Sequence, residues 1–169
     1  MRVGMLMVML ALAGCDAPGT LGVAAADVET VVLAPQPFEM TSEGRVFDPA
    51  QPLESLGLAW ACVVLKTDYA SRRQSDMEHD YQVLMDGRTL SATFIDTRGV
   101  AHQVSGANLG WTRHGPLSSD GELSACLLAT DDQIPKGSLI ESIRLQSDRP
   151  FPVVGAYWET LPRQLAHHQ

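Results

Sequence analysis

The chain has 169 residues, with 20 Asp and Glu against 12 Lys and Arg, and a formal net charge of −8 at pH 7 with neutral histidines. Negative charge of this size disfavours a phosphate-binding surface, so the composition argues against nucleic acid as a partner. The length suits one domain with a full hydrophobic core.

The amino terminus is apolar and almost uncharged. Arg2 is the only charged residue before Asp16, and apolar residues fill the segment from Val3 to Ala13. A positive start, a short apolar run and small residues at its end are typical of a secretion signal. The run is too short to cross a hydrocarbon core, which takes about 20 residues. An ordinary secretory signal and a buried N-terminal helix are the alternatives that this run alone leaves open.

The end of the apolar run is more specific, because it reads Leu12-Ala13-Gly14-Cys15. This tetrapeptide resembles the lipobox of bacterial lipoproteins. The resemblance implies that residues 1–14 are a signal peptide, that the chain is cut before Cys15, and that lipid on Cys15 anchors it to a membrane of the bacterial envelope, facing the periplasm. Two or three acyl chains are needed for stable anchoring, since each buried CH₂ contributes about 0.8 kcal/mol. Asp16 resembles the residue that retains lipoproteins in the inner membrane, with the outer membrane as the alternative.

Removal of residues 1–14 would leave a charge of −9, because Arg2 is the only charge lost. This charge argues against broad adhesion to anionic lipid, so the lipid itself is the expected anchor. Residues 15–27 are small and turn-prone and are expected to form a tether of at most ~40 Å. The folded domain is expected to span residues 28–169.

The rest of the chain alternates between strand-like runs and turns. Turns recur at the interval of about 8–12 residues expected of a β-sandwich or barrel, and no stretch has a convincing helical pattern. Asp86-Gly87 is the strongest hairpin signal, and the three runs around it predict a meander. The strand-like runs are 28–34, two short pieces around Gly44, 57–67, 80–85, 89–97, 100–106, 122–130, 139–147 and 151–160. The predicted fold is all-β, an antiparallel β-sandwich that is immunoglobulin-like or jelly-roll-like.

Two cysteines remain if Cys15 carries lipid. In an exported protein an even remainder predicts a disulfide, here Cys62–Cys126, with two buried free thiols as the alternative. Both residues lie in the middle of strands, so the bridge could join two packed sheets or two neighbouring strands. Trp60 shares a face with Cys62 and could pack beside the bridge. This resembles the tryptophan-on-disulfide core of immunoglobulin-type sandwiches, although there the tryptophan lies on a third strand.

The chain contains no catalytic motif with a recognised spacing, and no cofactor is predicted. The densest polar cluster could offer carboxylate oxygens to Ca²⁺, or a histidine to a transition metal. It lacks the glycine and the final glutamate of an EF-hand loop, so a solvated loop is the favoured interpretation. The weak metal candidates in it are Asp76, Glu78, His79 and Asp80. His102, within a strand, is expected to be hydrogen-bonded or on the surface rather than a ligand.

Three aromatic residues are candidate contacts. Trp111 lies among glycines and a proline, which predicts a loop, where it could bind a partner, stack on a sugar or plug the end of the sandwich. Tyr157 and Trp158 are neighbours in the last strand, so their side chains point to opposite faces and one is expected to be exposed.

The sequence favours a non-catalytic envelope lipoprotein whose domain binds another envelope protein, as an adaptor, an accessory subunit or an inhibitor. The first alternative is a module that binds glycan or peptidoglycan through Trp111 with Tyr157 or Trp158. The second is a periplasmic hydrolase or metal carrier built on the loop from Asp76 to Asp80.

Overall fold

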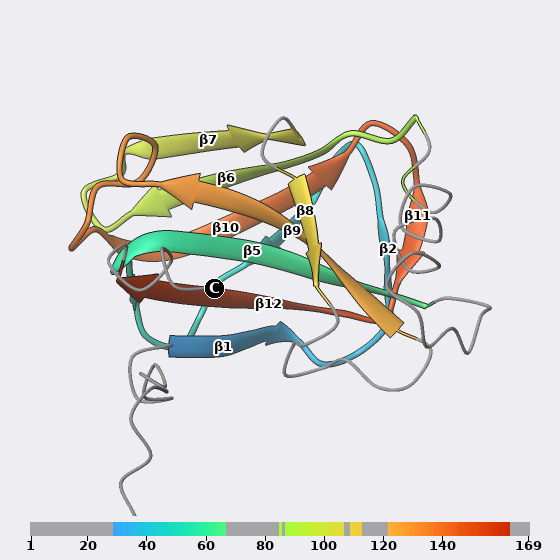
Figure 1. Ribbon diagram of the computed structural model, residues 1–169, viewed down its shortest axis with the longest axis horizontal. Coiled ribbons are helices and arrows are strands. Elements are labelled where there is room, and N and C mark those ends of the chain that lie inside the picture. The colour runs from blue at the N-terminus through green and yellow to red at the C-terminus, as the bar shows by residue number, and fades with distance from the viewer. Residues whose placement is uncertain (1–28, 67–84, 86, 107–108, 113–121, 163–169) are drawn as a thin grey trace, which may run out of the picture.

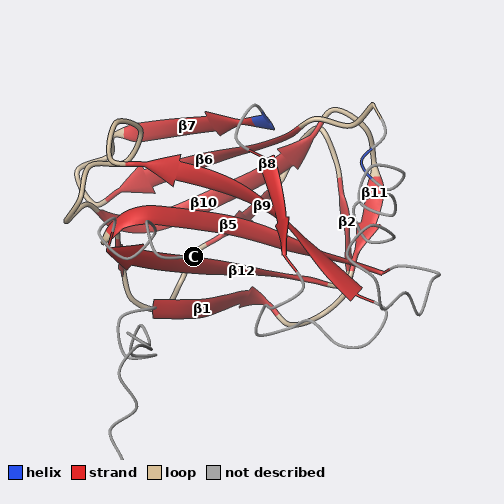
Figure 2. Cartoon of the chain, in the orientation of Figure 1, coloured by secondary structure: helices blue, strands red, loops and turns tan. Residues whose placement is uncertain are grey.

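The computed structural model describes residues 29–66, 85, 87–106, 109–112 and 122–162, with the backbone alone described for 109–112. All the elements in these ranges are strands, and the two short pieces in the helix colour in Figure 2 are single residues, Met85 and Gly106. The strands are β1 (Glu29–Ala34), β2 (Phe38–Met40), β3 (Arg45–Phe47), β4 (Leu53–Glu54), β5 (Gly57–Lys66), β6 (Leu90–Asp96), β7 (Ala101–Ser105), β8 (Leu109–Thr112), β9 (Glu122–Thr130), β10 (Leu139–Ser147), β11 (Phe151–Val153) and β12 (Gly155–Pro162).

These strands form two packed sheets in which every pairing is antiparallel. One sheet has the order β1-β12-β5-β9-β8, and the other has the order β3-β10-β6-β7 with β4 added to β10. The pair β11-β2 lies across one end of the two sheets (Figure 1). The predicted all-β, antiparallel sandwich is therefore confirmed.

The core lies between the sheets because strands on both sides turn alternate side chains inward. In β6, Leu90, Ala92 and Phe94 are buried and the residues between them are half-buried. Phe94 meets Trp158 of the opposite sheet edge-on, with ring centroids 5.5 Å apart, and both side chains are 0% exposed. An aromatic pair of this kind contributes about 0.5–1.5 kcal/mol beyond the burial of its apolar area.

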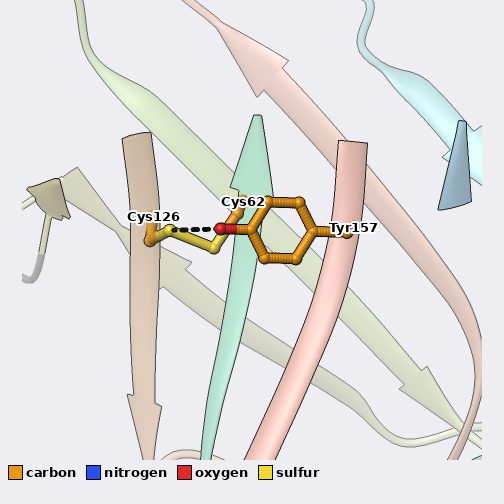
Figure 3. Close-up of a disulfide and its surroundings, with 3 residues drawn as sticks. All are labelled: Cys62, Cys126 and Tyr157. Atoms are coloured by element: carbon orange, nitrogen blue, oxygen red, sulfur yellow. Dashed lines mark hydrogen bonds between the residues drawn. A yellow bond between two sulfur atoms is a disulfide. The ribbon is translucent and has the colours of Figure 1, made fainter. Parts of the chain in front are cut away.

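The disulfide lies on the outer face of the β1-β12-β5-β9-β8 sheet, away from the core between the two sheets. Tyr157, Cys62 and Cys126 lie in register across β12, β5 and β9 (Figure 3). They form a second buried cluster, and Trp60 packs against it. The predicted Cys62–Cys126 bridge is confirmed, and it joins neighbouring strands with a Cα–Cα distance of 4.0 Å. The bridge therefore reinforces one sheet, whereas the immunoglobulin bridge joins two sheets.

Tyr157 completes this cluster with its hydroxyl group. The hydroxyl lies 3.7 Å from Sγ of Cys126 and can donate to it, because a bridged sulfur carries no proton. Burial raises the pKa of Tyr157, a hydrogen bond with Ser124 acts against this, and the charge of Glu159 adds to it. The phenol therefore stays protonated at neutral pH and keeps its donor.

The predicted meander is correct for the runs 89–97 and 100–106, which form the antiparallel pair β6-β7, and wrong for its first strand, because the other neighbour of β6 is β10. Met85, the last residue of the predicted strand over 80–85, lies in no strand, and residues 80–84 lie outside the described ranges. The chain turns just before β6, since the N–H of Arg88 donates to the carbonyl of Met85 at 2.8 Å. The neighbours of β6 are β7 and β10, because β10 brings its own buried residues opposite those of β6.

Removing the disulfide with the double variant C62A/C126A is expected to lower the free energy of unfolding by about 4 kcal/mol, from the chain entropy of the loop that it closes. The bridge spans 64 positions, and both cysteines are buried. Urea unfolding of the oxidised protein and of the variant measures the difference. Equal stability of the two would show that the bridge adds nothing to the fold.

Candidate functional site

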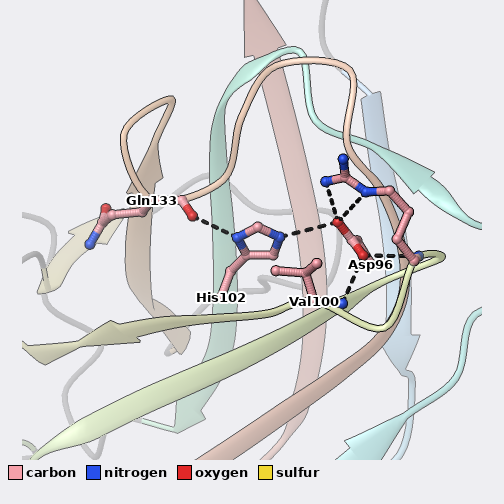
Figure 4. A network of polar contacts seen from close by, with 5 residues as sticks. Asp96, Val100, His102 and Gln133 are labelled. Carbon is pink, nitrogen blue, oxygen red and sulfur yellow. Dashed lines mark hydrogen bonds and ion pairs between the residues drawn. The ribbon is translucent and has the colours of Figure 1, made fainter.

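A network of hydrogen bonds among the described residues lies where β6 turns into β7. Asp96 ends β6, and its side chain is 1% exposed. Its Oδ1 accepts the backbone N–H groups of Arg98 and Val100, at 2.9 and 3.0 Å. Its Oδ2 accepts Nη2 and Nε of Arg98, at 2.7 and 3.1 Å (Figure 4). One carboxylate therefore fixes both the backbone of the turn and the arginine that the turn carries.

These donors keep Asp96 charged. The Arg98 guanidinium holds the pKa of Asp96 well below its ordinary value of 3.8; burial acts in the opposite direction, and the N–H groups of Val100 and Arg98 and the ring of His102 help to lower it. A carboxylate that accepts several N–H bonds is stabilised in its ionised form. The turn therefore depends on a negative charge at this position.

His102 connects the turn to a second loop. Its Nδ1 lies 2.9 Å from the carbonyl oxygen of Gln133, and its Nε2 lies 3.4 Å from Oδ2 of Asp96 (Figure 4). A carbonyl oxygen only accepts, so the contact with Gln133 requires a proton on Nδ1, and the contact of Nε2 with the ionised Asp96 is a hydrogen bond only when the ring carries a second proton. Both ring nitrogens are thus occupied within the network, which suits a positioning role better than proton transfer to a third group. His102 is hydrogen-bonded, as predicted from the sequence.

Backbone hydrogen bonds and one buried side chain also hold the loop between β9 and β10 in place. The N–H of Ile134 donates to the carbonyl of Thr130 at 2.8 Å, and the Ile134 side chain is 1% exposed in the core. The backbone of Ser55 bonds to this loop twice. Its N–H donates to the carbonyl of Ser138 at 2.9 Å, and its carbonyl accepts the N–H of Gly137 at 2.7 Å. We call residues 96–102 and 130–139 together the hairpin end.

The hairpin end displays apolar side chains on this fixed backbone. Val100 is 46% exposed and Leu139 is 44% exposed, and the Arg98 side chain is 69% exposed. The backbones of Val100 and Leu139 are bonded to the same turn. The backbone N–H of Asp96 donates to the carbonyl of Val100, and the backbone N–H of Thr97 donates to the carbonyl of Leu139. A rigid display of this kind lowers the entropy cost of binding a partner.

The aromatic candidates are corrected by the structure. The prediction that Tyr157 or Trp158 is exposed is wrong, since both are 0% exposed. The reason is that β12 is an inner strand, so that Trp158 enters the core between the sheets and Tyr157 packs beside the disulfide. These two rings therefore offer no stacking surface for a sugar.

Trp111 does not lie in a loop, because β8 includes it and pairs its backbone with Ala125. The glycines around it are compatible with a short strand at the edge of the sheet. The other candidates lie outside the described residues; they are Cys15, Asp76, Glu78, His79 and Asp80.

The sequence indicated the turn of the hairpin end but not its network. The run from Asp96 to Gly99 is turn-like, because an aspartate readily bonds the backbone two residues further on. The bond from His102 to Gln133 spans 31 positions, so no local pattern could reveal it.

Within the part of the chain that the structure describes, no group of three or more His, Cys, Asp or Glu residues is arranged to hold a metal ion. A search of the same residues found no helix with the length and apolarity to cross a membrane. Comparisons of the chain with protein-family models, curated proteins and solved structures found no match.

The variant Asp96→Asn is expected to be less stable than the parent at pH 7, because the amide cannot replace the charge that four N–H groups contact. The pKa of Asp96 is lowered by folding from 3.8, so the carboxylate's contribution is complete above that value and is lost as the pH falls further below it. Urea midpoints of the two proteins should converge as the pH is lowered below about 4. Asp132→Asn, at an exposed position of the same end, is the control and should change little.

Proposed function

We propose that this protein is a lipid-anchored lipoprotein of the bacterial envelope, facing the periplasm, whose sandwich binds another envelope protein through the hairpin end. The binding is non-catalytic, and the protein acts as an adaptor, an accessory subunit or an inhibitor. The observation that carries the proposal is the display of Arg98, Val100 and Leu139 on a backbone held by Asp96 and His102.

The position of the hairpin end supports a partner at the membrane. β1 begins with Glu29 at the same end of the sandwich (Figure 1). A tether over 15–27 would keep this end within ~40 Å of the lipid on Cys15. Proteins that project from the same membrane would then meet the hairpin end at a high effective concentration. Asp16 favours the inner membrane.

The exposed side chains suit a modest interface. Burial of a valine or leucine side chain contributes about 1.5–3 kcal/mol, so Val100 and Leu139 together can supply a useful share of a micromolar affinity. Arg98 adds a side-chain type that is enriched at binding hot spots. Because Asp96 holds the guanidinium in place, little freedom of this side chain remains to be lost on binding.

Cys15→Ala is expected to abolish lipid attachment and to leave the leader uncut or the protein misplaced. Metabolic labelling with a palmitate analogue, followed by fractionation of the envelope, measures both effects. Cys62→Ala is the matched control, because it removes a thiol from the disulfide and should still incorporate the label. A Cys15→Ala protein that is labelled and fractionates like the parent would refute the anchor.

A photo-crosslinking residue at position 100 is expected to capture one defined partner from intact cells. The control is the same residue at Val46 on β3, because Val46 is 45% exposed against 46% for Val100 and lies outside the hairpin end. Val100→Asp should reduce the recovery of that partner by an affinity pull-down from solubilised envelope, since it places a charge in an apolar contact. Equal crosslinking from both positions, or none from position 100, would contradict a binding surface at the hairpin end.

A further inference from the structure

β7 forms one edge of the sheet β3-β10-β6-β7, where β6 is the strand that pairs with it (Figure 1). An edge strand carries backbone N–H and C=O groups that can pair with another strand, and proteins usually block such edges with a charge, a proline, a bulge or a very short strand. β7 has none of these features: its five residues include no proline and no Asp, Glu, Lys or Arg, and its pairing with β6 is regular. β7 is therefore open to a further strand.

The other sheet edges that the structure describes are less suited to pairing. β1 begins with Glu29 and contains a bulge between Val32 and Ala34. β3 and β4 have only three and two residues, and β3 begins with Arg45. β8 has four residues, and one of them is a glycine, which weakens a strand. Among the described edges, β7 therefore offers the longest regular and uncharged stretch of backbone.

The register with β6 shows which backbone groups of β7 face outward. The N–H of Asp96 donates to the carbonyl of Val100, and hydrogen-bonded pairs alternate along an antiparallel ladder. His102 and Val104 therefore bond to β6. The alternate residues point their N–H and C=O groups away from β6, where no described residue bonds to them, and their side chains are exposed; they are Ala101, Gln103 and Ser105.

The outer surface of β6 and β7 is uncharged, although the chain is acidic. Beside the exposed residues of β7, the outer positions of β6 are held by Ser91, Thr93 and Ile95. The carboxylate of Asp96 does not reach this surface, because its side chain is 1% exposed. A net charge of −8 makes copies of the chain repel each other, and the repulsion is weakest where neither copy displays a carboxylate. This surface is therefore one along which two copies can approach.

We propose that β7 pairs antiparallel with β7 of a second copy of this chain, about a two-fold axis at Gln103. Gln103 then lies opposite its own copy, and Ala101 lies opposite Ser105 of the second copy. Every outward N–H group of these three residues meets an outward carbonyl of the other strand, so the symmetric register leaves none unpaired. An amide side chain both donates and accepts, so the two Gln103 side chains can also bond to each other.

The two strands of this pair run in opposite directions. The hairpin ends of the two copies therefore lie at opposite ends of the dimer. The dimer does not rest on the proposed function, and its test uses the purified chain without any other protein.

Sedimentation velocity of the purified full-length chain, with free thiols alkylated, tests for the dimer. A monomer–dimer equilibrium with a Kd on the order of 100 µM is expected, because a single strand edge makes a small interface. Hydrogen exchange over the same concentrations locates the contact. The amides of Ala101, Gln103 and Ser105 should become protected as the concentration rises, whereas those of His102 and Val104 are protected throughout by β6. A chain that stays monomeric at about ten times that Kd, or a dimer in which the three outward amides exchange as in the monomer, would overturn the proposal.

Three variants separate the edge from the net charge. Gln103→Lys should weaken the dimer roughly fivefold, because it places two positive charges opposite each other across the axis. Gln146→Lys makes the same change of charge on β10, an inner strand, and should dimerise as the parent does. Gln103→Pro should weaken the dimer more than about tenfold, since it removes an N–H that bonds to the second copy and not to β6. Because Gln103 is exposed, Gln103→Lys keeps the test valid even if Gln103→Pro fails to fold. Equal effects of the two lysine variants would count against pairing through β7.

Discussion

The packing of the two sheets through their inner faces is the interaction on which the rest of the structure depends. Phe94 and Trp158 meet across it, and strands β5, β9 and β12 supply most of one side. These three strands are buried on their outer face as well, where the disulfide and Tyr157 lie. A shift of β12 by one residue would exchange Trp158 on the inner face with Tyr157 on the outer face, and each ring is packed in its own cluster, so the packing selects the register. The disulfide reinforces the register that the core already selects.

This packing also explains why a charged side chain is buried at the hairpin end. Asp96 occupies the next inward position of β6 after Leu90, Ala92 and Phe94, so the register of the strand directs its carboxylate inward. Burial of an unpaired carboxylate would be costly, and the N–H groups of the turn offset that cost. The same carboxylate then orders the turn and, through His102, the loop between β9 and β10. The rigidity that suits this end to partner binding is thus a consequence of the core.

The two ends of the sandwich differ in chemistry. At the hairpin end, Arg98 is paired with a buried carboxylate and stands beside exposed apolar side chains, which suits a protein surface. At the other end, Leu65, Phe151 and Val153 lie in the apolar wall of a cavity that Lys66, Arg88 and Glu122 also line. β1 begins at the hairpin end, so the anchor proposed ahead of β1 would join the sandwich at that end.

The sequence by itself determined the all-β fold class, most strand positions, the Cys62–Cys126 pairing and the position of Trp60 beside the bridge. The alternation of side chains along a strand is a local pattern, and an even number of remaining cysteines can be counted from the sequence. Only the tertiary structure decided that the bridge joins neighbouring strands, that Tyr157 and Trp158 are both buried, and that Trp111 belongs to a strand. It also decided the contact of His102 with Gln133 and the cavity beyond β5. The physical reason is that these features depend on which strands become neighbours and which faces become covered, and both follow from contacts between residues far apart in the chain.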